Sequence, residues 1–292
     1  MRYRADPSRP LFDFRVFDAS ELADRAGALQ DILHKRLDGL IVRGVLSPET
    51  LAAVVARLEQ PATERREFPM FKGQQGAPYT VGQAIVSTEH DLVDYFRDAR
   101  LQQARLASLF EGRQDYQSRI AEVISALAGG LPAQVAHAPD GSLFTPSTVR
   151  VLPEGHEMGV HVGNGFARLP QARHLSGLID MSDQISFFIP LSVPRAGGEL
   201  VVYGLEYSDV SAFMPQSTSA ESSNVWLDGT AIAGFFQTMD CTHFAPGPGD
   251  MLIFDGGRYF HRVSKVEGPA PRRTIGGFIG FSLDHDRLFY WS

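Results

Sequence analysis

The chain from residue 131 onward consists of short strand-like runs separated by turns, and this pattern limits the possible folds more than any other feature. Residues common in strands alternate there with Gly, Pro, Asn and Asp, which end strands. The clearest runs are AQVAHA, STVRVLP, QISFFIPLSV, ELVVYGLEY, HFAPGPGDMLIFDG, YFHRVSKV and RTIGGFIGFS. Many short strands with such turns predict a sandwich, a jelly roll or a barrel.

The first 130 residues have a different, mostly helical pattern. Apolar residues at helical spacing predict helices over residues 19–38, 48–60 and 88–128, the last broken near Gly112. Ser47 is a suitable N-cap, and Pro48 would occupy the first helical position. Between the first two helices, GLIVRGVLS predicts a buried strand over residues 39–47.

We expect a single domain over residues 1–292, of α+β class with a mainly β core. The segment at 128–132 is too short to separate two independent domains. Residues 1–130 would supply helices packed on one face of the β core formed by 131–292. Residues 1–18 have the pattern of an extended arm, and 68–86 that of a long loop, which in compact domains tends to be a lid.

Composition excludes several functions. The net charge of −7 gives no bulk attraction to nucleic acid or to an anionic membrane. Cys241 is the only cysteine, so no disulfide can form within the chain, which fits a reducing compartment. We find neither a secretory signal nor a run approaching the ~18 apolar residues of a membrane span. We therefore expect a cytoplasmic protein that acts on a small molecule.

Two histidines stand in similar surroundings within the β-rich region. In VRVLPEGHEMGVHVGNGF a strand and a turn precede His161, and in PGPGDMLIFDGGRYFHRV a strand and a turn precede His261. Between them, the turn at 197–199 opens another strand, and Arg272 follows His261 by eleven residues.

This ordered set resembles the iron(II)/2-oxoglutarate-dependent oxygenases over roughly residues 145–285. The resemblance implies a double-stranded β-helix, a jelly-roll or cupin-like core, buttressed by the N-terminal helices. It also implies that His161 and His261 hold Fe(II), with 2-oxoglutarate and O2 as cosubstrates. Arg272 and Thr274 would hold the distal carboxylate of 2-oxoglutarate. They are two apart on a strand and so share a face, whereas Arg273 would face the other way; a register slip of one residue would exchange the two arginines.

One departure from the family pattern concerns the third metal ligand. The family has His-x-Asp/Glu, but Gly163 occupies the carboxylate position here, two residues from His161 and expected on the same strand face. Chloride fits a coordination position that lacks a carboxylate, and His-x-Gly or His-x-Ala is the signature of iron(II)/2-oxoglutarate halogenases.

Among these enzymes the chain most resembles the freestanding halogenases of hapalindole- and welwitindolinone-type alkaloids. The resemblance implies chlorination of an unactivated sp3 carbon, with 2-oxoglutarate converted to succinate and CO2, and no need for a carrier protein. Ser186, on an intervening strand, would donate a hydrogen bond beside the metal. Four apolar residues would line the substrate pocket: Val81, Ile85, Met158 and Phe166.

Other interpretations remain open at this point. Gly163 could be a turn glycine, with Asp250 or Asp255 supplying the third ligand from elsewhere. His156 and Glu157 suggest a zinc-protease motif, but HEMGVH is one residue longer than HExxH. A hydroxylase or desaturase that leaves water at the vacant position is a second enzymatic function. A non-catalytic β-barrel binding module is the alternative outside enzymes.

Overall fold

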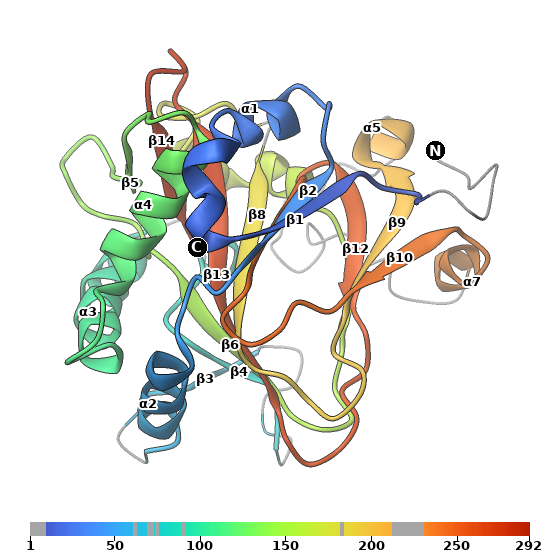
Figure 1. The fold of residues 1–292 in the computed structure, drawn as a ribbon, viewed down its shortest axis with the longest axis horizontal. Coiled ribbons are helices and arrows are strands. Elements are labelled where there is room, and N and C mark those ends of the chain that lie inside the picture. Colours follow the sequence, from blue (N-terminus) through green and yellow to red (C-terminus); the bar gives the residue numbers. More distant parts are fainter. Residues whose placement is uncertain are drawn as a thin grey trace.

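Two β-sheets packed against each other form the centre of the protein (Figure 1). The computed structural model describes residues 10–60, 63–68, 73, 76–88, 92–181, 184–211 and 231–292. Apolar residues of the larger sheet, such as Leu252 and Phe254, pack between the sheets against Leu200 and Val202 of the smaller one.

The larger sheet has the strand order β1-β2-β11-β8-β13-β6-β4-β3, with β14 pairing with β13 and β5 pairing with β14. Its strands are β1 (Phe14–Asp18), β2 (Gly39–Arg43), β3 (Arg66–Glu67), β4 (Tyr79–Val81), β5 (Ala133–Val135), β6 (Thr148–Leu152), β8 (Ile185–Ser192), β11 (Met251–Phe254), β13 (Arg272–Phe281) and β14 (Leu288–Trp291). β1 and β2 are parallel, as are β5 and β14, whereas the central pairs are antiparallel.

The smaller sheet has the order β10-β9-β12-β7 and is antiparallel. Its strands are β7 (Met158–His161), β9 (Leu200–Glu206), β10 (Cys241–Phe244) and β12 (Tyr259–Val263). β7 follows β6 in sequence, and β12 follows β11, so each of these connections passes from the larger sheet to the smaller one. This alternation is typical of a jelly roll, and it confirms the expected fold class.

Helices from the first half of the chain cover the outer face of the larger sheet, as Figure 1 shows for α2, α3 and α4. The α-helices are α1 (Ala28–Leu33), α2 (Pro48–Leu58), α3 (Val93–Leu109), α4 (Tyr116–Leu127), α5 (Tyr207–Val210) and α7 (Ala231–Gln237). The 3-10 helices are η1 (Ala19–Arg25), η3 (Ile85–Ser87), η4 (Gly163–Arg168) and η5 (Pro170–His174). Residues of α1, α2, α3 and α4 share one apolar core with β8 and β13, so these helices support the sheet as expected.

The sequence pattern located α2, α3 and α4 correctly. The Ser47 hydroxyl accepts a hydrogen bond from the Thr50 N–H at the start of α2, and α3 and α4 are separated around Gly112. The single helix expected over 19–38 is wrong. Gly27, at a φ of +88°, divides it into η1 and the short α1, because this left-handed conformation ends a helix.

The N-terminal half also contributes more β structure than its helical pattern indicated. The expected arm contains β1, which pairs with β2 and so extends the larger sheet. The expected lid loop contains β4, which pairs with β3, and part of η3. The rest of the lid prediction falls partly on residues 69–72 and 74–75, which lie outside the described residues.

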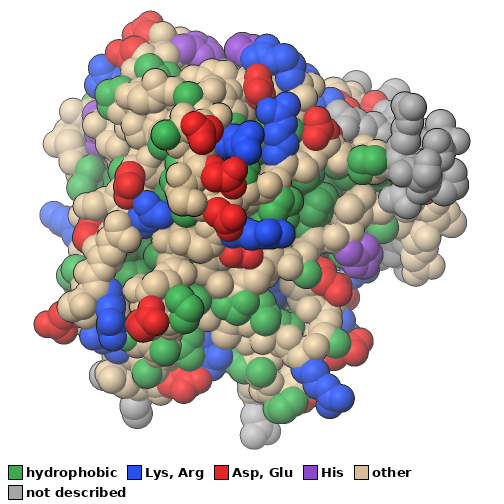
Figure 2. All heavy atoms as spheres, in the orientation of Figure 1, with side chains coloured by type: hydrophobic (Ala, Val, Ile, Leu, Met, Phe, Trp, Pro, Cys, Tyr) green, Lys and Arg blue, Asp and Glu red, His purple; other side chains and the backbone are tan. Residues whose placement is uncertain are grey.

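Charged side chains of both signs lie on the surface. In the view of Figure 2, acidic and basic side chains are interspersed and do not gather into one basic area. Within the described part of the chain, no helix is both long enough and apolar enough to cross a membrane.

We predict that the interface between the helices and the larger sheet dominates stability. Ile189 on β8 is fully buried in it. Ile189→Ala should lower the free energy of unfolding by about 2–5 kcal/mol, because it leaves a cavity in a close-packed core. Val16 on the edge strand β1 is 47% exposed, so Val16→Ala is the control and should change stability little. Urea unfolding of both variants is the measurement, and equal losses would contradict this assignment of the core.

Candidate active site

The two candidate metal ligands meet in the smaller sheet. β7 and β12 are antiparallel neighbours, and His161 is the direct register partner of His261. The centroids of the two imidazole rings are 4.2 Å apart. Residues a hundred positions apart in sequence are thus brought within reach of one metal ion.

Both rings are oriented by main-chain carbonyl groups. The Nδ1 atom of His161 lies 2.9 Å from the Gly159 oxygen, and that of His261 lies 2.8 Å from the Tyr259 oxygen. A carbonyl oxygen can only accept, so Nδ1 carries the proton of each neutral ring. The lone pair is then on Nε2, the form in which histidine binds a metal.

Electrostatics keeps both histidines neutral. Burial lowers the pKa of His161 to about 4; the Gly159 carbonyl opposes this shift, and the positive charge of Arg150 reinforces it. Burial, followed by His161 and Arg150, lowers the pKa of His261 well below its usual value. Protons therefore do not compete with a metal ion at neutral pH.

The position expected to lack a carboxylate is held close to another segment of backbone. Gly163 was expected on the same strand as His161, but the structure places it outside that strand. β7 ends at His161, and Gly163 is the first residue of η4. The Gly163 N–H donates to the Gly256 oxygen at 2.8 Å. A Cβ at residue 163 would lie 3.0 Å from that oxygen and 3.1 Å from the Gly257 Cα.

These distances bear on why residue 163 is glycine. Its φ lies outside the left-handed region, so its backbone conformation does not require glycine. The close approach of the turn at 255–257 is the local reason for a small residue. A side chain here must displace this turn by a few tenths of an ångström.

No carboxylate from elsewhere completes a protein ligand set in the described parts of the chain, where no group of three or more His, Cys, Asp or Glu residues could hold a metal. Both oxygens of Asp250 accept hydrogen bonds from main-chain N–H groups, those of Gly44 and Gly247. Asp255 accepts from the Arg258 N–H within its own turn. The HEMGVH segment is a turn followed by β7, which excludes a helical HExxH motif.

The donor set therefore fits iron(II) bound by two neutral imidazoles. Imidazole is a suitable ligand for iron, and non-haem oxygenases bind iron through two histidines and a carboxylate with further positions left open. The remaining positions would be filled by molecules from solution.

Arg272 lies inside the β-helix, at the start of β13. Its Nε donates to the Gly198 oxygen at 2.7 Å and its Nη1 to the Thr274 hydroxyl at 3.3 Å, and its guanidinium stacks over Phe188. These partners are neutral. Arg273 faces outward instead and pairs with Glu59 at 2.6 Å. The expected face sharing of residues 272 and 274 is therefore present, and the alternative register is not.

Arg150 is a second interior cation, and the sequence analysis missed it. It is on β6 as the register partner of Thr274, so the two side chains share the inner face of the sheet. Its guanidinium makes no hydrogen bond or ion pair with the residues that the structure describes, and burial alone lowers its pKa. Burial and Arg150 together lower the pKa of Arg272 to about 9. An arginine inside the apolar strand TVRVL was the sequence signal for this residue.

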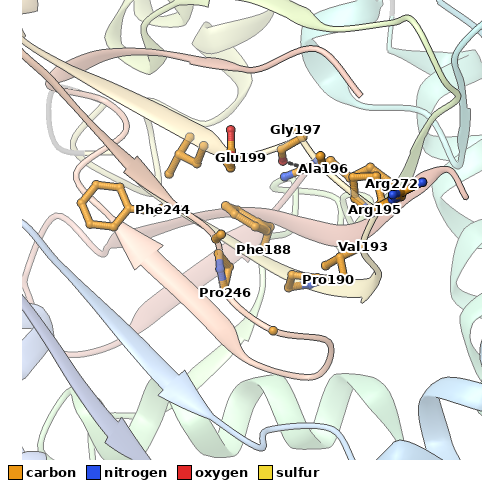
Figure 3. Close-up of a pocket in the computed structure, with 15 residues that line it drawn as sticks. Phe188, Pro190, Val193, Arg195, Ala196, Gly197, Glu199, Phe244, Pro246 and Arg272 are labelled. Carbon is orange, nitrogen blue, oxygen red and sulfur yellow. Dashed lines mark hydrogen bonds between the residues drawn. The ribbon is translucent and has the colours of Figure 1, made fainter. Parts of the chain in front are cut away.

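A cavity of about 240 Å³ reaches Arg272. Figure 3 shows Phe244 at one end of this cavity and Arg272 at the other, with Phe188 between them. The turn at 195–199 forms another wall. Arg272 thus borders a space that a small anion can enter.

Ser186 on β8 packs beside the same turn that approaches Gly163. A Cβ on Gly256 would run directly into the Ser186 hydroxyl, so the two residues are in close contact. Its role as a hydrogen-bond donor near the metal stays a prediction.

The four residues expected to line the substrate pocket fall into three separate clusters. Ile85 and Phe166 share one apolar cluster. Met158 packs in a second cluster, and Val81 belongs to the core beneath the helices. The structure brings only Ile85 and Phe166 together, and a common pocket for all four residues stays a prediction.

The fold and the paired histidines together define a class of protein, the double-stranded β-helix oxygenases that use non-haem iron. Among solved structures, the chain is similar to an N-substituted L-amino acid dioxygenase from Burkholderia ambifaria AMMD, with a TM-score of 0.55, 14% identity and 90% coverage of each chain. The structure of such a dioxygenase from the same organism in complex with alpha-KG gives a TM-score of 0.51 and 13% identity, again with 90% coverage of each chain. These likenesses support the fold. No curated protein sequence matches the chain.

The family itself follows from sequence. Residues 11–292 match the family described as carrier-protein-independent halogenase WelO5, and the chain belongs to this family. It is therefore a non-haem iron(II)/2-oxoglutarate-dependent enzyme of the halogenase type.

We predict that both histidines are needed for metal binding. His161→Ala or His261→Ala should abolish measurable Fe(II) binding, because one imidazole cannot hold the ion without a protein carboxylate. His156→Ala is the matched control, since His156 is in the same segment but outside the pair. Anaerobic calorimetric titration with Fe(II) measures the affinity, and near-normal binding by both variants would remove them as ligands.

A second prediction concerns Arg272. Arg272→Ala should weaken 2-oxoglutarate binding by about 10- to 100-fold, because hydrogen bonds to a charged group contribute roughly 1.5–3 kcal/mol. Arg273→Ala is the control, since it loses an ion pair with Glu59 on the outer face. Anaerobic titration of the iron-loaded variants with 2-oxoglutarate, followed by absorbance, compares them. A larger effect of Arg273→Ala would refute the assignment.

Proposed function

We propose that the protein chlorinates an unactivated sp3 carbon of a freestanding small molecule, using O2 and converting 2-oxoglutarate to succinate and CO2. The observation that carries this proposal is a pair of neutral histidines, His261 buried and His161 partly buried, with no carboxylate completing a ligand set among the described residues. When bound, iron with the keto acid and O2 supplies the oxidising power to remove hydrogen from carbon. Family membership supports a substrate that is not attached to a carrier protein.

The residues of the site would have two roles, since some would bind the iron and others would bind anions. Nε2 of His161 and of His261 would bind the iron. Chloride would take the coordination position for which residue 163, a glycine, provides no carboxylate. Arg272 and Thr274 would hold the distal carboxylate of 2-oxoglutarate, because the guanidinium has only neutral partners and borders a cavity.

Arg150 adds a further positive charge to the site. The loaded site would hold the doubly negative keto acid and chloride. Arg150 is an interior cation whose charge reaches both histidines and Arg272. A buried charge is costly without a partner, so the free site favours anions. We assign Arg150 to the retention of the keto acid's C1 carboxylate or of chloride near the iron.

The remaining assignments depend on packing. Ser186 would donate a hydrogen bond beside the chloride position, since it contacts the turn that approaches Gly163. Ile85 and Phe166 would border the substrate, with Val81 and Met158 behind them. The whole chain would act as one domain, because helices from 1–130 share a core with strands from 131–292.

The test is anaerobic titration of the iron-loaded protein with 2-oxoglutarate, with and without chloride. We expect the iron–keto acid absorption band to form and to shift when chloride is added. Product masses from turnover with chloride and in its absence then identify chlorination. A band that ignores chloride even with substrate bound would favour a hydroxylase that leaves water at the vacant position.

We predict that Gly163→Asp eliminates the chloride response while Gly163→Ala keeps it. Both variants add a Cβ against Gly256 and Gly257, so they share the steric cost of that atom. Only aspartate adds an anionic oxygen that can occupy the vacant position and repel chloride. The measurement is the shift of the absorption band in the two variants. Loss of the shift in both would point to displacement of the turn and would contradict the occupancy argument.

A further inference from the structure

A buried hydrogen bond joins the N-terminal part of the chain to the strand that carries His261. The Tyr259 hydroxyl donates to Oδ1 of Asp38 at 2.6 Å, and both residues are buried. Tyr259 is the first residue of β12, and its carbonyl oxygen is the one that accepts from Nδ1 of His261 at 2.8 Å. The same residue thus binds Asp38 through its side chain and orients His261 through its main chain.

Asp38 also holds the turn that precedes β12. Its carbonyl oxygen accepts from the Asp255 N–H at 3.2 Å, and the Asp255 carbonyl accepts from the Tyr259 N–H at 3.1 Å. These bonds and the side-chain bond close a ring through Asp38, Asp255 and Tyr259. Oδ2 of Asp38 accepts from the Asp13 N–H at 2.8 Å, which fixes the carboxyl group to the segment before β1.

The turn held by Asp38 also reaches the other half of the site. The Gly256 oxygen accepts from the Gly163 N–H at 2.8 Å, and the Gly257 oxygen accepts from the Asn164 N–H at 3.0 Å. The position proposed for chloride therefore depends on the same turn as His261.

The Tyr259 ring is fixed on its faces and edges as well as at its hydroxyl. Phe12 meets it edge-on with ring centroids 5.0 Å apart, and the Arg258 guanidinium lies 4.7 Å from its centroid. A ring restrained in this way has little freedom to rotate, so it transmits the position of Asp38 to the backbone of β12. By contrast, His161 is held by the carbonyl of Gly159, which has no side chain through which it can be anchored.

We propose that Asp38 and Tyr259 are positioning residues for the iron ligand His261. They fix the carbonyl oxygen that sets the rotation of the imidazole and so aim Nε2 at the metal. Outer hydrogen-bond partners of a metal-binding histidine typically contribute 10- to 100-fold to metal affinity. The inference rests on the proposed function, because it requires His261 to bind iron.

The decisive variant is Tyr259→Phe, which removes one hydroxyl and keeps the ring. Tyr116→Phe is a matched control, because the Tyr116 hydroxyl is equally buried and donates to Ser147 at 2.9 Å, away from both histidines. Fe(II) affinity is measured anaerobically for each protein at a temperature where the metal-free form is folded, and thermal unfolding of the metal-free form is recorded alongside. We expect both variants to lose stability but only Tyr259→Phe to bind iron about tenfold or more weakly.

A second variant tests whether the two residues act together. Asp38→Ala should weaken iron binding to a similar degree. The double variant Asp38→Ala/Tyr259→Phe should bind iron no more weakly than the single variant with the lower affinity, because the effects of removing two partners of one interaction do not add. Full addition of the two effects would contradict a shared role.

The outcomes separate this inference from the proposed function. If the wild type and Tyr259→Phe bind iron equally, the positioning role is wrong and the iron site stands. An equal loss of affinity in Tyr116→Phe would show a general effect of stability, which also overturns the positioning role. If the wild type itself binds no iron, the proposed function fails, and this inference fails with it.

Discussion

The pairing of β7 with β12 is the constraint on which the site depends. It places His161 opposite His261, and the Nδ1 atom of each ring faces a main-chain carbonyl oxygen. The turn at 255–257, just before β12, then packs on Gly163 and on Ser186. One local arrangement of backbone therefore brings together the two candidate ligands, the position without a carboxylate and the nearby serine. Changes in this turn are expected to affect all of them together.

The charge distribution complements this geometry. The histidines are neutral, and the interior face of β6 and β13 carries Arg150 and Arg272 without a carboxylate partner among the described residues. Such a site is destabilised when empty of anions and stabilised when anions enter, because buried charges need partners. This arrangement suits the proposed uptake of anionic metal ligands from solution. The N-terminal part of the chain supports it from outside, through Asp38 and Tyr259.

The sequence was most informative where local patterns have one physical cause. Ser47 followed by Pro48 marks a helix start, because the hydroxyl caps an N–H and proline needs none. The alternation of residues along a strand placed Arg272 and Thr274 on one face and Arg273 on the other. The His-x-Gly pattern and the second histidine at a fixed distance indicated the family, which the match over residues 11–292 confirms.

Tertiary structure decided what depends on contacts between distant segments. Arg150 looked like an ordinary strand residue, and only its pairing with Thr274 shows that it faces the site. Val81 and Ile85 are near in sequence but lie in different cores, because a sheet separates its two faces. The surroundings of Gly163 likewise depend on packing. The sequence showed that a carboxylate is missing at this position. The approach of Gly256 and Gly257 shows why any side chain at residue 163 is crowded. Residue types and their order thus determined the fold class and the candidate metal-binding pair, while the surroundings of that pair came from the packing of segments far apart in sequence.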